Sequence, residues 1–558
     1  MDHVLESEVC QETIPASRSQ TRTPIHFLVG DLVLLGAVAL LAHGLLLLND
    51  GIYWDDWLLY RHLQGHDWQT IDALVHEAGM TPVNSAFLHL FAYVPGGVFS
   101  FKLTVFLLIV AVAWLVYLIG VQVGLNRLTA WCVAALQMVF PGFQDWVVLA
   151  TAASVFDFAL FLLATLLLVR AERAALRPRL ALRVAAAAIF ILSFGFNSLL
   201  PLYFGSLLLL LLVARRSASL RELVRTRWLY ATALILLPIA YWEVSQRLYV
   251  PSGLYGGVNS FSTMPSTVLS TFARFVRHGI VEQMLQSLAV LLRPWTWLML
   301  AAFIAILVIA WRRMLNAPNP QPRLAIAGTA LGFVGMGLAI LPYALVGKST
   351  AMHGWESRHD LLVGLPLAVL LVCLVSIVLP SGRRAWLGLG LLGLVAIGFI
   401  GAGIEDYAAL QARWATDRAV MAELRSTGGS DGFSVYWVHD GAPGPEDFYR
   451  FYEWSAMLGN VYGDQARVGL DVRGYDSGFL ERTQFFSDRY NLANFDPHGC
   501  QADLTVQRSR SAGTSGQVAA MYTFYRLLQP DRLDGYVRGL VTVHVVPMSN
   551  PSATNCSQ

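Results

Sequence analysis

The stretch FLVGDLVLLGAVALLAHGLLLLNDGIYWDDW, residues 27–57, decides the fold of this chain. Its first part, residues 27–48, is long and apolar enough to form a helix that crosses a membrane, because a span needs about 20 apolar residues. The segment directly after it carries two adjacent carboxylates, Asp55 and Asp56, between two tryptophans. The stretch therefore predicts a membrane protein that displays an acidic pair where its first helix ends.

The composition of the whole chain also indicates a membrane protein. Of its 558 residues, 56% are hydrophobic and only 14% are charged, and the formal net charge of +2 gives no sign of a nucleic-acid partner. Soluble proteins of this size carry more charge, so we expect a polytopic α-helical membrane protein. Residues 1–24 are polar and lack the apolar run of a cleaved signal peptide. We therefore expect a cytoplasmic tail over residues 1–26 and a first helix that is retained as an anchor.

Apolar stretches recur along the chain up to about residue 404. Each is a candidate for a transmembrane helix, since it approaches the length that a bilayer requires. The eleven predicted spans are about 27–48, 98–123, 128–143, 147–169, 183–197, 199–214, 229–249, 295–311, 324–345, 361–379 and 386–404.

Arginine clusters orient these spans, because cytoplasmic loops are enriched in Arg and Lys. Every cluster follows an even-numbered predicted span. The clusters comprise Arg170, Arg173, Arg177, Arg179 and Arg183; Arg215, Arg216, Arg221, Arg225 and Arg227; Arg312, Arg313 and Arg323; and Arg383 and Arg384. The pattern predicts a cytoplasmic N-terminus, with the odd-numbered loops and the C-terminal region on the opposite side.

The first outer loop, about residues 49–97, contains two helix-like stretches that are too short to span. One is amphipathic and ends near Trp68, and the other runs from Pro82 to Tyr93. Both patterns are typical of helices that lie in the membrane interface.

The C-terminal region, residues 405–558, is polar and rich in Gly, Asp and Tyr. Alternating apolar and polar runs near 433–438 and 541–546 predict strands, so we expect a soluble α/β domain on the outer side. Cys500 and Cys556 both lie in this region, and they are predicted to form a disulfide if the region is extracytoplasmic.

This layout resembles the GT-C superfamily of membrane glycosyltransferases, of the protein mannosyltransferase or aminoarabinose transferase type. The resemblance rests on Asp55–Asp56 in the first outer loop, on the interfacial helix that opens at Thr81-Pro82-Val83-Asn84, and on Asp145 in the second outer loop. It covers residues 27–404 as a catalytic module, followed by a soluble outer domain. It implies a multi-pass protein of the bacterial plasma (inner) membrane that transfers a sugar from a polyprenyl-phosphate donor to a lipid, glycan or protein acceptor.

The implied reaction explains the need for a carboxylate. An acceptor hydroxyl is a poor nucleophile, so a base must take its proton as it attacks the anomeric carbon, which contributes about 10²–10⁴-fold to the rate. A single displacement inverts the configuration at that carbon. Either Asp55 or Asp56 would be this base, and we favour Asp55, with its neighbour orienting the acceptor or binding a divalent ion. No cofactor is required by the sequence.

Further residues are assigned to substrate binding by the same resemblance. Fixed cations would stabilise the lipid phosphate as it leaves, and tryptophans would stack on sugar rings, although they equally suit an aromatic belt at the interface. The predicted binding residues are Asp145, Lys348, Glu356, Arg358, His359, Trp54 and Trp57, with Arg274 and Arg277 as alternative phosphate ligands. Asp157 and Glu243 fall inside predicted spans, where carboxylates are functional candidates.

Two other functions fit a protein of this shape. A glycan ligase or polymerase also acts on lipid-linked substrates, but such enzymes depend on outer-loop Arg and His rather than on an acidic pair after the first helix. A transporter or flippase would place its polar residues at mid-membrane, often with internal repeats. A glycosyltransferase should instead bring Asp55–Asp56, Asp145 and Arg358 together at the outer surface.

Overall fold

The computed structural model describes most of the chain. The described residues are 25–93, 97–215, 220–252, 255–257, 260–261, 264–314, 322–379, 383–427, 432–441, 449–463, 466–485, 495–509 and 512–548. The predicted N-terminal tail lies outside these ranges, except for residues 25 and 26, which begin the first helix. Cys556 also lies outside them.

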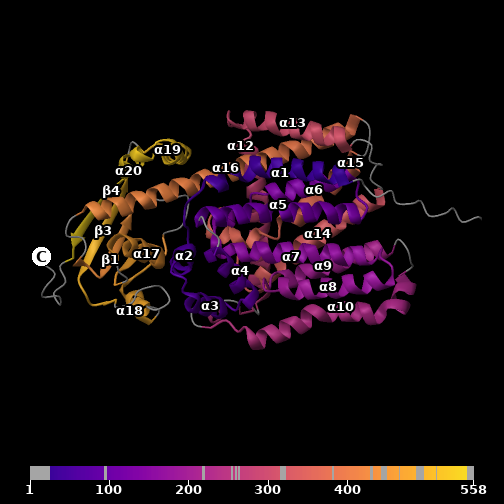
Figure 1. Cartoon of the computed structure of the whole chain (residues 1–558), viewed down its shortest axis with the longest axis horizontal. Coiled ribbons are helices and arrows are strands. Elements are labelled where there is room, and N and C mark those ends of the chain that lie inside the picture. Colours follow the sequence, from indigo (N-terminus) through magenta and orange to yellow (C-terminus); the bar gives the residue numbers. More distant parts are fainter. Residues whose placement is uncertain are drawn as a thin grey trace, which may run out of the picture.

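The protein is a helical membrane protein, and its long apolar helices form one bundle (Figure 1). Within the described ranges, seven helices are long and apolar enough to cross a membrane. They are α1 (Ile25–Leu48), α5 (Val98–Gln122), α7 (Leu149–Ala171), α10 (Leu220–Leu248), α13 (Thr296–Met314), α14 (Pro322–Leu345) and α16 (Arg383–Ser426).

Four shorter helices complete the predicted set of eleven. They are α6 (Arg127–Val139), α8 (Leu176–Ser193), α9 (Leu199–Ala214) and α15 (Gly364–Val378). Each predicted span thus coincides with a helix, while seven of these helices meet the length and hydropathy of a span. Helices α14 and α15 approach closely because Gly332 has no side chain: an added Cβ would lie 2.9 Å from the Cα of Leu370.

The first outer segment forms three short helices, where the sequence predicted two. These are α2 (Asp56–Gln64), α3 (Trp68–Glu77) and α4 (Pro82–Tyr93). The break before α3 has a local cause: His66 adopts a φ of +53°, and the Asp67 side chain accepts a hydrogen bond from the Thr70 amide at 3.2 Å, which caps α3. The amphipathic stretch that we expected to continue to Trp68 therefore ends one turn earlier.

The long segment between α10 and α13 is also helical. It contains α11 (Pro265–Arg274), a π-helical stretch η3 (Phe275–Glu282) and α12 (Gln283–Val290). Two short 3₁₀ helices, η1 (Asp145–Val147) and η4 (Trp355–Asp360), lie in the loop between α6 and α7, the predicted second outer loop, and in the loop between α14 and α15, the predicted late outer loop.

Helix α16 joins the bundle to the C-terminal region (Figure 1). It contains 44 residues, so it is about 66 Å long, roughly twice the thickness of a membrane's apolar core. Its second half leaves the bundle and packs against α17, α19, α20 and β4. The helix therefore runs through residue 404, where the sequence placed the end of the last span and the start of the C-terminal domain.

The C-terminal region contains a four-stranded mixed sheet in the order β2-β1-β3-β4. Strand β1 (Val435–Asp440) is parallel to β2 (Val468–Asp471) and β3 (Gln501–Arg508), and β3 is antiparallel to β4 (Val541–Pro547). The accompanying helices are α17 (Phe451–Tyr462), α18 (Ser477–Phe485), α19 (Ser515–Leu528) and α20 (Pro530–Arg538). Both strands predicted from alternation are confirmed as β1 and β4.

Cys500, directly before β3, is disulfide-bonded. Its partner lies outside the described residues, as does the predicted partner Cys556. Cys132 and Cys373 are buried free thiols.

Candidate functional site

The acidic pair sits at a sharp turn between α1 and α2. Trp54, directly before the pair, has a φ of +47°, a conformation that a bulky side chain rarely adopts. Asp55 follows as a half-buried residue, whereas Asp56 begins α2 and is only 3% exposed. The turn separates the two carboxylates, and each of them has different partners.

Asp56 is held by the N-terminus of α7. Its two oxygens accept hydrogen bonds from the amides of Leu149 (2.8 Å) and Ala150 (3.0 Å), donors that the first turn of a helix leaves unpaired. Burial raises the pKa of Asp56 to about 7, while the Lys102 ammonium and these two amides limit the rise. The site thus contains a carboxylate that gains and loses its proton near neutral pH.

Lys102 is a fully buried cation on α5. Its ammonium donates a hydrogen bond to the carbonyl of Val147 and lies 5.1 Å from the ring centre of Phe101. It is therefore fixed beneath the acidic pair by groups from two helices.

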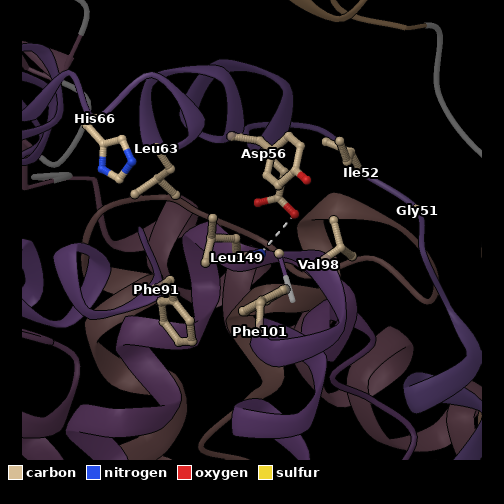
Figure 2. Close-up of a pocket in the computed structure, with 11 residues that line it drawn as sticks. Gly51, Ile52, Asp56, Leu63, His66, Phe91, Val98, Phe101 and Leu149 are labelled. Carbon is tan, nitrogen blue, oxygen red and sulfur yellow. Dashed lines mark hydrogen bonds between the residues drawn. The ribbon is translucent and has the colours of Figure 1, made fainter. Parts of the chain in front are cut away.

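A cavity of about 330 Å³ lies beside Asp56 (Figure 2). Asp56 and His66 face it from opposite ends of α2, and most of its wall between them is apolar (Figure 2). The lining residues are Gly51, Ile52, Asp56, Tyr60, Leu63, His66, Phe91, Gly97, Val98, Phe101 and Leu149. The cavity is formed by the interfacial helices α2 and α4 together with the outer ends of α5 and α7.

Asp55 faces the C-terminal region instead. Its Oδ1 accepts a hydrogen bond of 2.5 Å from the Tyr452 hydroxyl on α17. Burial, followed by the charges of Asp55 and Glu453, raises the pKa of Tyr452 well above its ordinary value, so this hydroxyl keeps its proton and acts as a donor. Asp55 is thus one of the contacts that join the membrane part to the sheet.

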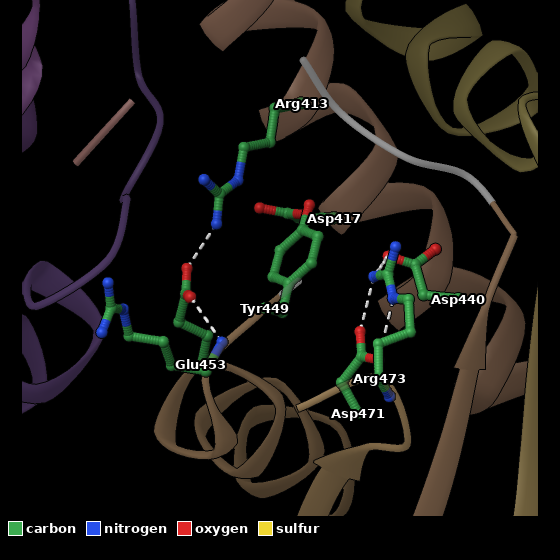
Figure 3. Close-up of polar contacts among 8 residues, drawn as sticks. Arg413, Asp417, Asp440, Tyr449, Glu453, Asp471 and Arg473 are labelled. Atoms are coloured by element: carbon green, nitrogen blue, oxygen red, sulfur yellow. Dashed lines mark hydrogen bonds and ion pairs between the residues drawn. The ribbon is translucent and has the colours of Figure 1, made fainter. Parts of the chain in front are cut away.

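Three segments meet at Glu453, also on α17 (Figure 3). Its Oε1 accepts the Trp54 amide at 3.2 Å and pairs with Arg413 of α16, and its Oε2 accepts the Arg450 amide at 2.9 Å. On the same side, Tyr449 donates a 2.5 Å hydrogen bond to Asp417 of α16. The acidic turn is therefore tied to both α16 and α17.

The second outer loop is bound to the late outer loop through Gln144. Its side-chain amide donates to the Met352 carbonyl at 2.9 Å and accepts from the Gly354 amide at 3.1 Å. The neighbouring Asp145 is fully buried at the start of η1. The structure thus brings the two loops together, but neither Asp145 nor Arg358, which were predicted to converge with the acidic pair, is among the residues that line the cavity beside Asp56.

The predicted phosphate ligands gather in the late outer loop. Arg358 donates to the Trp355 carbonyl at 2.7 Å, lies 3.5 Å from Glu356, and stacks on the Trp355 ring. Burial and the Arg358 charge lower the pKa of Lys348, and they lower that of the buried His359 well below its ordinary value. His359 contacts the Ser349 carbonyl at 2.9 Å, so it is a neutral packing residue rather than a cation.

The late loop reaches the acidic turn through Trp355, which contacts Trp54, while Trp57 contacts Trp414 of α16. The ring centres of Trp355 and Trp54 are 5.7 Å apart, and those of Trp57 and Trp414 are 5.8 Å apart. Trp54 and Trp57 are each only 4% exposed. Their predicted stacking on a sugar, like a role in an aromatic belt, has no support in the structure, because both rings belong to the packed interior.

The remaining candidates occupy other places. Arg274 and Arg277 are exposed, and Arg277 pairs with Glu282 at 2.9 Å. Glu243 is mostly exposed and lies 3.6 Å from Arg247. Asp157 is buried in α7 and accepts a 2.9 Å hydrogen bond from Asn84, which joins the interfacial helix α4 to the bundle.

Sequence reasoning missed several residues that surround the acidic pair: Lys102, Arg413, Tyr452, Glu453 and His66. A lysine four residues into an otherwise apolar span was a usable signal, since an intramembrane charge is costly without a partner. His66 falls in the amphipathic stretch that the sequence predicts to lie in the membrane interface. The other three lie hundreds of residues away in the sequence, and no local pattern links them to Asp55.

Across the part of the chain that the structure describes, no group of three or more His, Cys, Asp or Glu residues is arranged to hold a metal ion. In comparisons with known proteins, no family model matches the chain, and no curated protein resembles it significantly.

Proposed function

We propose that this protein is an inverting glycosyltransferase that moves a sugar from a polyprenyl-phosphate donor to an acceptor hydroxyl. One observation carries the proposal: Asp56 lines a mostly apolar cavity beside α2 and α4, where burial raises its pKa to about 7. A general base is most effective when its pKa lies near the working pH. The mostly apolar walls suit a substrate that approaches from the lipid phase.

In this mechanism the Asp56 carboxylate takes the proton of the acceptor hydroxyl. The oxygen attacks the anomeric carbon, the bond from that carbon to the phosphate oxygen breaks, and the lipid phosphate leaves with the electron pair. The transition state has oxocarbenium character, as in glycoside hydrolysis. The products are the glycoside, with inverted configuration, and the polyprenyl phosphate.

The surroundings of the two carboxylates favour Asp56 over Asp55 as the base, the reverse of the sequence-based preference. Asp56 lines the cavity, whereas Asp55 is bonded to Tyr452. Each oxygen of Asp56 accepts one amide hydrogen bond, which leaves a second lone pair on each for an incoming proton. Asp55 would hold the turn in place.

Arg358 and Lys348 are the proposed partners of the leaving phosphate. Arg358 lies close enough to Lys348 for its charge to lower the pKa of Lys348. The charge of Glu356 acts in the opposite direction and raises that pKa. Bringing two cations together is unfavourable unless an anion joins them, and a phosphate binds such groups strongly.

The proposal includes a location. Eleven spans in a bacterial plasma membrane would leave the N-terminus in the cytoplasm and the acidic turn, the late loop and the C-terminal region on the outer side. Membrane lipids would surround the bundle, and the acceptor would be a lipid, a glycan or a protein.

The test is sugar transfer from a radiolabelled polyprenyl-phosphate sugar pool by membranes that contain wild type, Asp56→Asn or Asp55→Asn. Asp56→Asn should reduce transfer by about 10²–10⁴-fold while donor lipid still binds. Asp55→Asn should have a smaller effect, because the Asn side-chain oxygen can still accept the Tyr452 hydroxyl. Undiminished transfer by both variants would contradict the proposal, provided that gel filtration shows both proteins to be folded.

A further inference from the structure

Glu453 is a buried carboxylate that joins three segments of the chain. It is 1% exposed and lies in the first turn of α17. One oxygen accepts the Arg450 amide of its own helix, and the other contacts the Trp54 amide and the Arg413 guanidinium. The Arg413 guanidinium also lies 5.0 Å from the centre of the Trp54 ring. The backbone and the ring of Trp54 are therefore both held by this ion pair.

The residue that Glu453 holds is a strained one. Trp54 has a φ of +47°, and a bulky side chain stays in the left-handed region only when its surroundings enforce it. This conformation turns the chain between Tyr53, which donates to the Leu410 carbonyl at 2.8 Å, and Asp55. Because Asp56 begins α2 directly after the turn, the direction of its carboxylate depends on this backbone.

A buried ion pair adds little net stability compared with apolar residues of similar size, since both charges must be desolvated. Such a pair fixes a particular geometry instead. Here Glu453 holds the amide of Trp54, and the residue before it in α17, Tyr452, donates a hydrogen bond to the side chain of Asp55.

We propose that Glu453 is a positioning residue that holds the Asp55–Asp56 turn in its working geometry, so that the C-terminal region completes the candidate site. This inference rests on the proposed function for its catalytic consequence. Its structural part concerns the turn alone and can be tested separately.

The experiment compares the full-length wild type with Glu453→Ala and Glu453→Gln in lipid nanodiscs. The matched control is Asp31→Asn, which breaks another buried ion pair, with Arg127 at 2.6 Å, on helices α1 and α6. Two quantities are measured: hydrogen exchange of the peptide that contains residues 52–57, and the pH dependence of sugar transfer.

Glu453→Ala should speed exchange in this peptide by about tenfold or more, since the Trp54 amide loses its acceptor. The exchange rate of this peptide in Glu453→Gln should lie between those of the wild type and Glu453→Ala, because the Gln side-chain oxygen can still accept a hydrogen bond from the Trp54 amide. Transfer by Glu453→Ala should fall by about 10–100-fold, as misplacement of a base by about 1 Å costs up to 10² in rate. The acid limb of its pH profile should move to lower pH, because a loosened turn admits water to Asp56.

A purely structural role would lower the yield of folded protein in Glu453→Ala, as in Asp31→Asn, without moving exchange of this peptide or the pH profile; that result would overturn the inference. If the wild type transfers no sugar, the proposed function fails, and the exchange measurement alone decides whether Glu453 holds the turn.

Discussion

At the scale of single residues, the chemistry of the site depends on how Asp56 is charged. Burial alone would keep this carboxyl protonated, and three groups counter that tendency: Lys102 and the amides of Leu149 and Ala150. The balance leaves its pKa at about 7. A base must be ionised to accept a proton, so transfer should decline as the pH falls through this value.

Replacing Lys102 with Met should move this decline to higher pH. The Lys102 charge lowers the pKa of Asp56, so its removal raises that pKa, by on the order of one unit. The measurement is the rate of sugar transfer from about pH 5 to about pH 9. Lys102→Arg, which keeps the positive charge, is the control and should retain most of the wild-type profile. An unmoved acid limb in Lys102→Met would show that Asp56 is not the titrating base.

Asp360 presents a second buried carboxyl, in the late outer loop. Thr350 donates to its Oδ2 at 2.6 Å, while its Oδ1 is buried with no hydrogen-bond partner among the described residues. Gly279 of η3 allows this packing, since a Cβ there would lie 2.6 Å from that oxygen. Burial raises the pKa of Asp360 well above its ordinary value.

The sign of its effect on stability follows from linkage. The folded protein retains the Asp360 proton to a higher pH than the unfolded chain, so stability declines as the pH rises above the ordinary value of Asp, about 3.9. The stability of Asp360→Asn should not decline in this way as the pH rises, because the variant has no carboxyl group at this position. Between about pH 5 and pH 8, we expect the unfolding temperature of the variant to gain about 2–4 °C or more on wild type. Asp503→Asn, at a partly exposed position of β3, should show no such gain.

At the scale of elements, α16 connects the helix bundle to the C-terminal sheet as one continuous helix. It is continuous from Arg383 to Ser426, and its outer half carries Arg413 and Asp417, which contact α17 and the segment before it. A helix of this length has no turn at which the C-terminal region could pivot. We infer that the outer half of α16 fixes the distance between the membrane surface and the sheet.

Ile404→Pro should uncouple the two halves of α16. Proline in a helix interior removes a backbone hydrogen bond and costs about 3 kcal/mol. We expect limited proteolysis to cut near residue 404 in the variant and not in Ile404→Ala. Sugar transfer by Ile404→Pro should fall in proportion to the fraction of the protein that the protease cuts, because Arg413 would no longer hold Glu453 in that fraction. Equal protease resistance of the two variants would contradict this role for α16.

At the scale of the whole molecule, the orientation in the membrane is the property that the proposed reaction requires. The arginine clusters predict that the loop before α8 lies in the cytoplasm and that the sheet lies on the opposite side. A membrane-impermeant maleimide should label Gln507→Cys in β3 in right-side-out vesicles, and should label Leu176→Cys only after permeabilisation. Both positions are exposed, the native Cys132 and Cys373 are buried, and labelling of the wild type in parallel gives the background from the native cysteines. The reverse labelling pattern would show that the topology is the opposite one, and it would contradict the assignment of the acidic turn to the outer face.

The sequence by itself determined the class of the fold and the positions of the seven long apolar helices, because a long apolar run in a membrane protein has few alternatives to a helix. It also indicated strands β1 and β4 and the acidic turn, all of which are local patterns. It could not show that α16 continues past residue 404, because a polar helix outside the membrane lacks the hydropathy signal on which the span was based.

Tertiary structure alone decided which carboxylate lines the cavity, because two adjacent residues are equivalent in the sequence until a backbone turn separates them. It also decided that Trp54 and Trp57 are buried rather than presented to a ligand. The contacts that set this turn come from Arg413 and Glu453, some 360 and 400 residues further along the chain. Such contacts depend on how helices and sheet dock, which local periodicity does not encode.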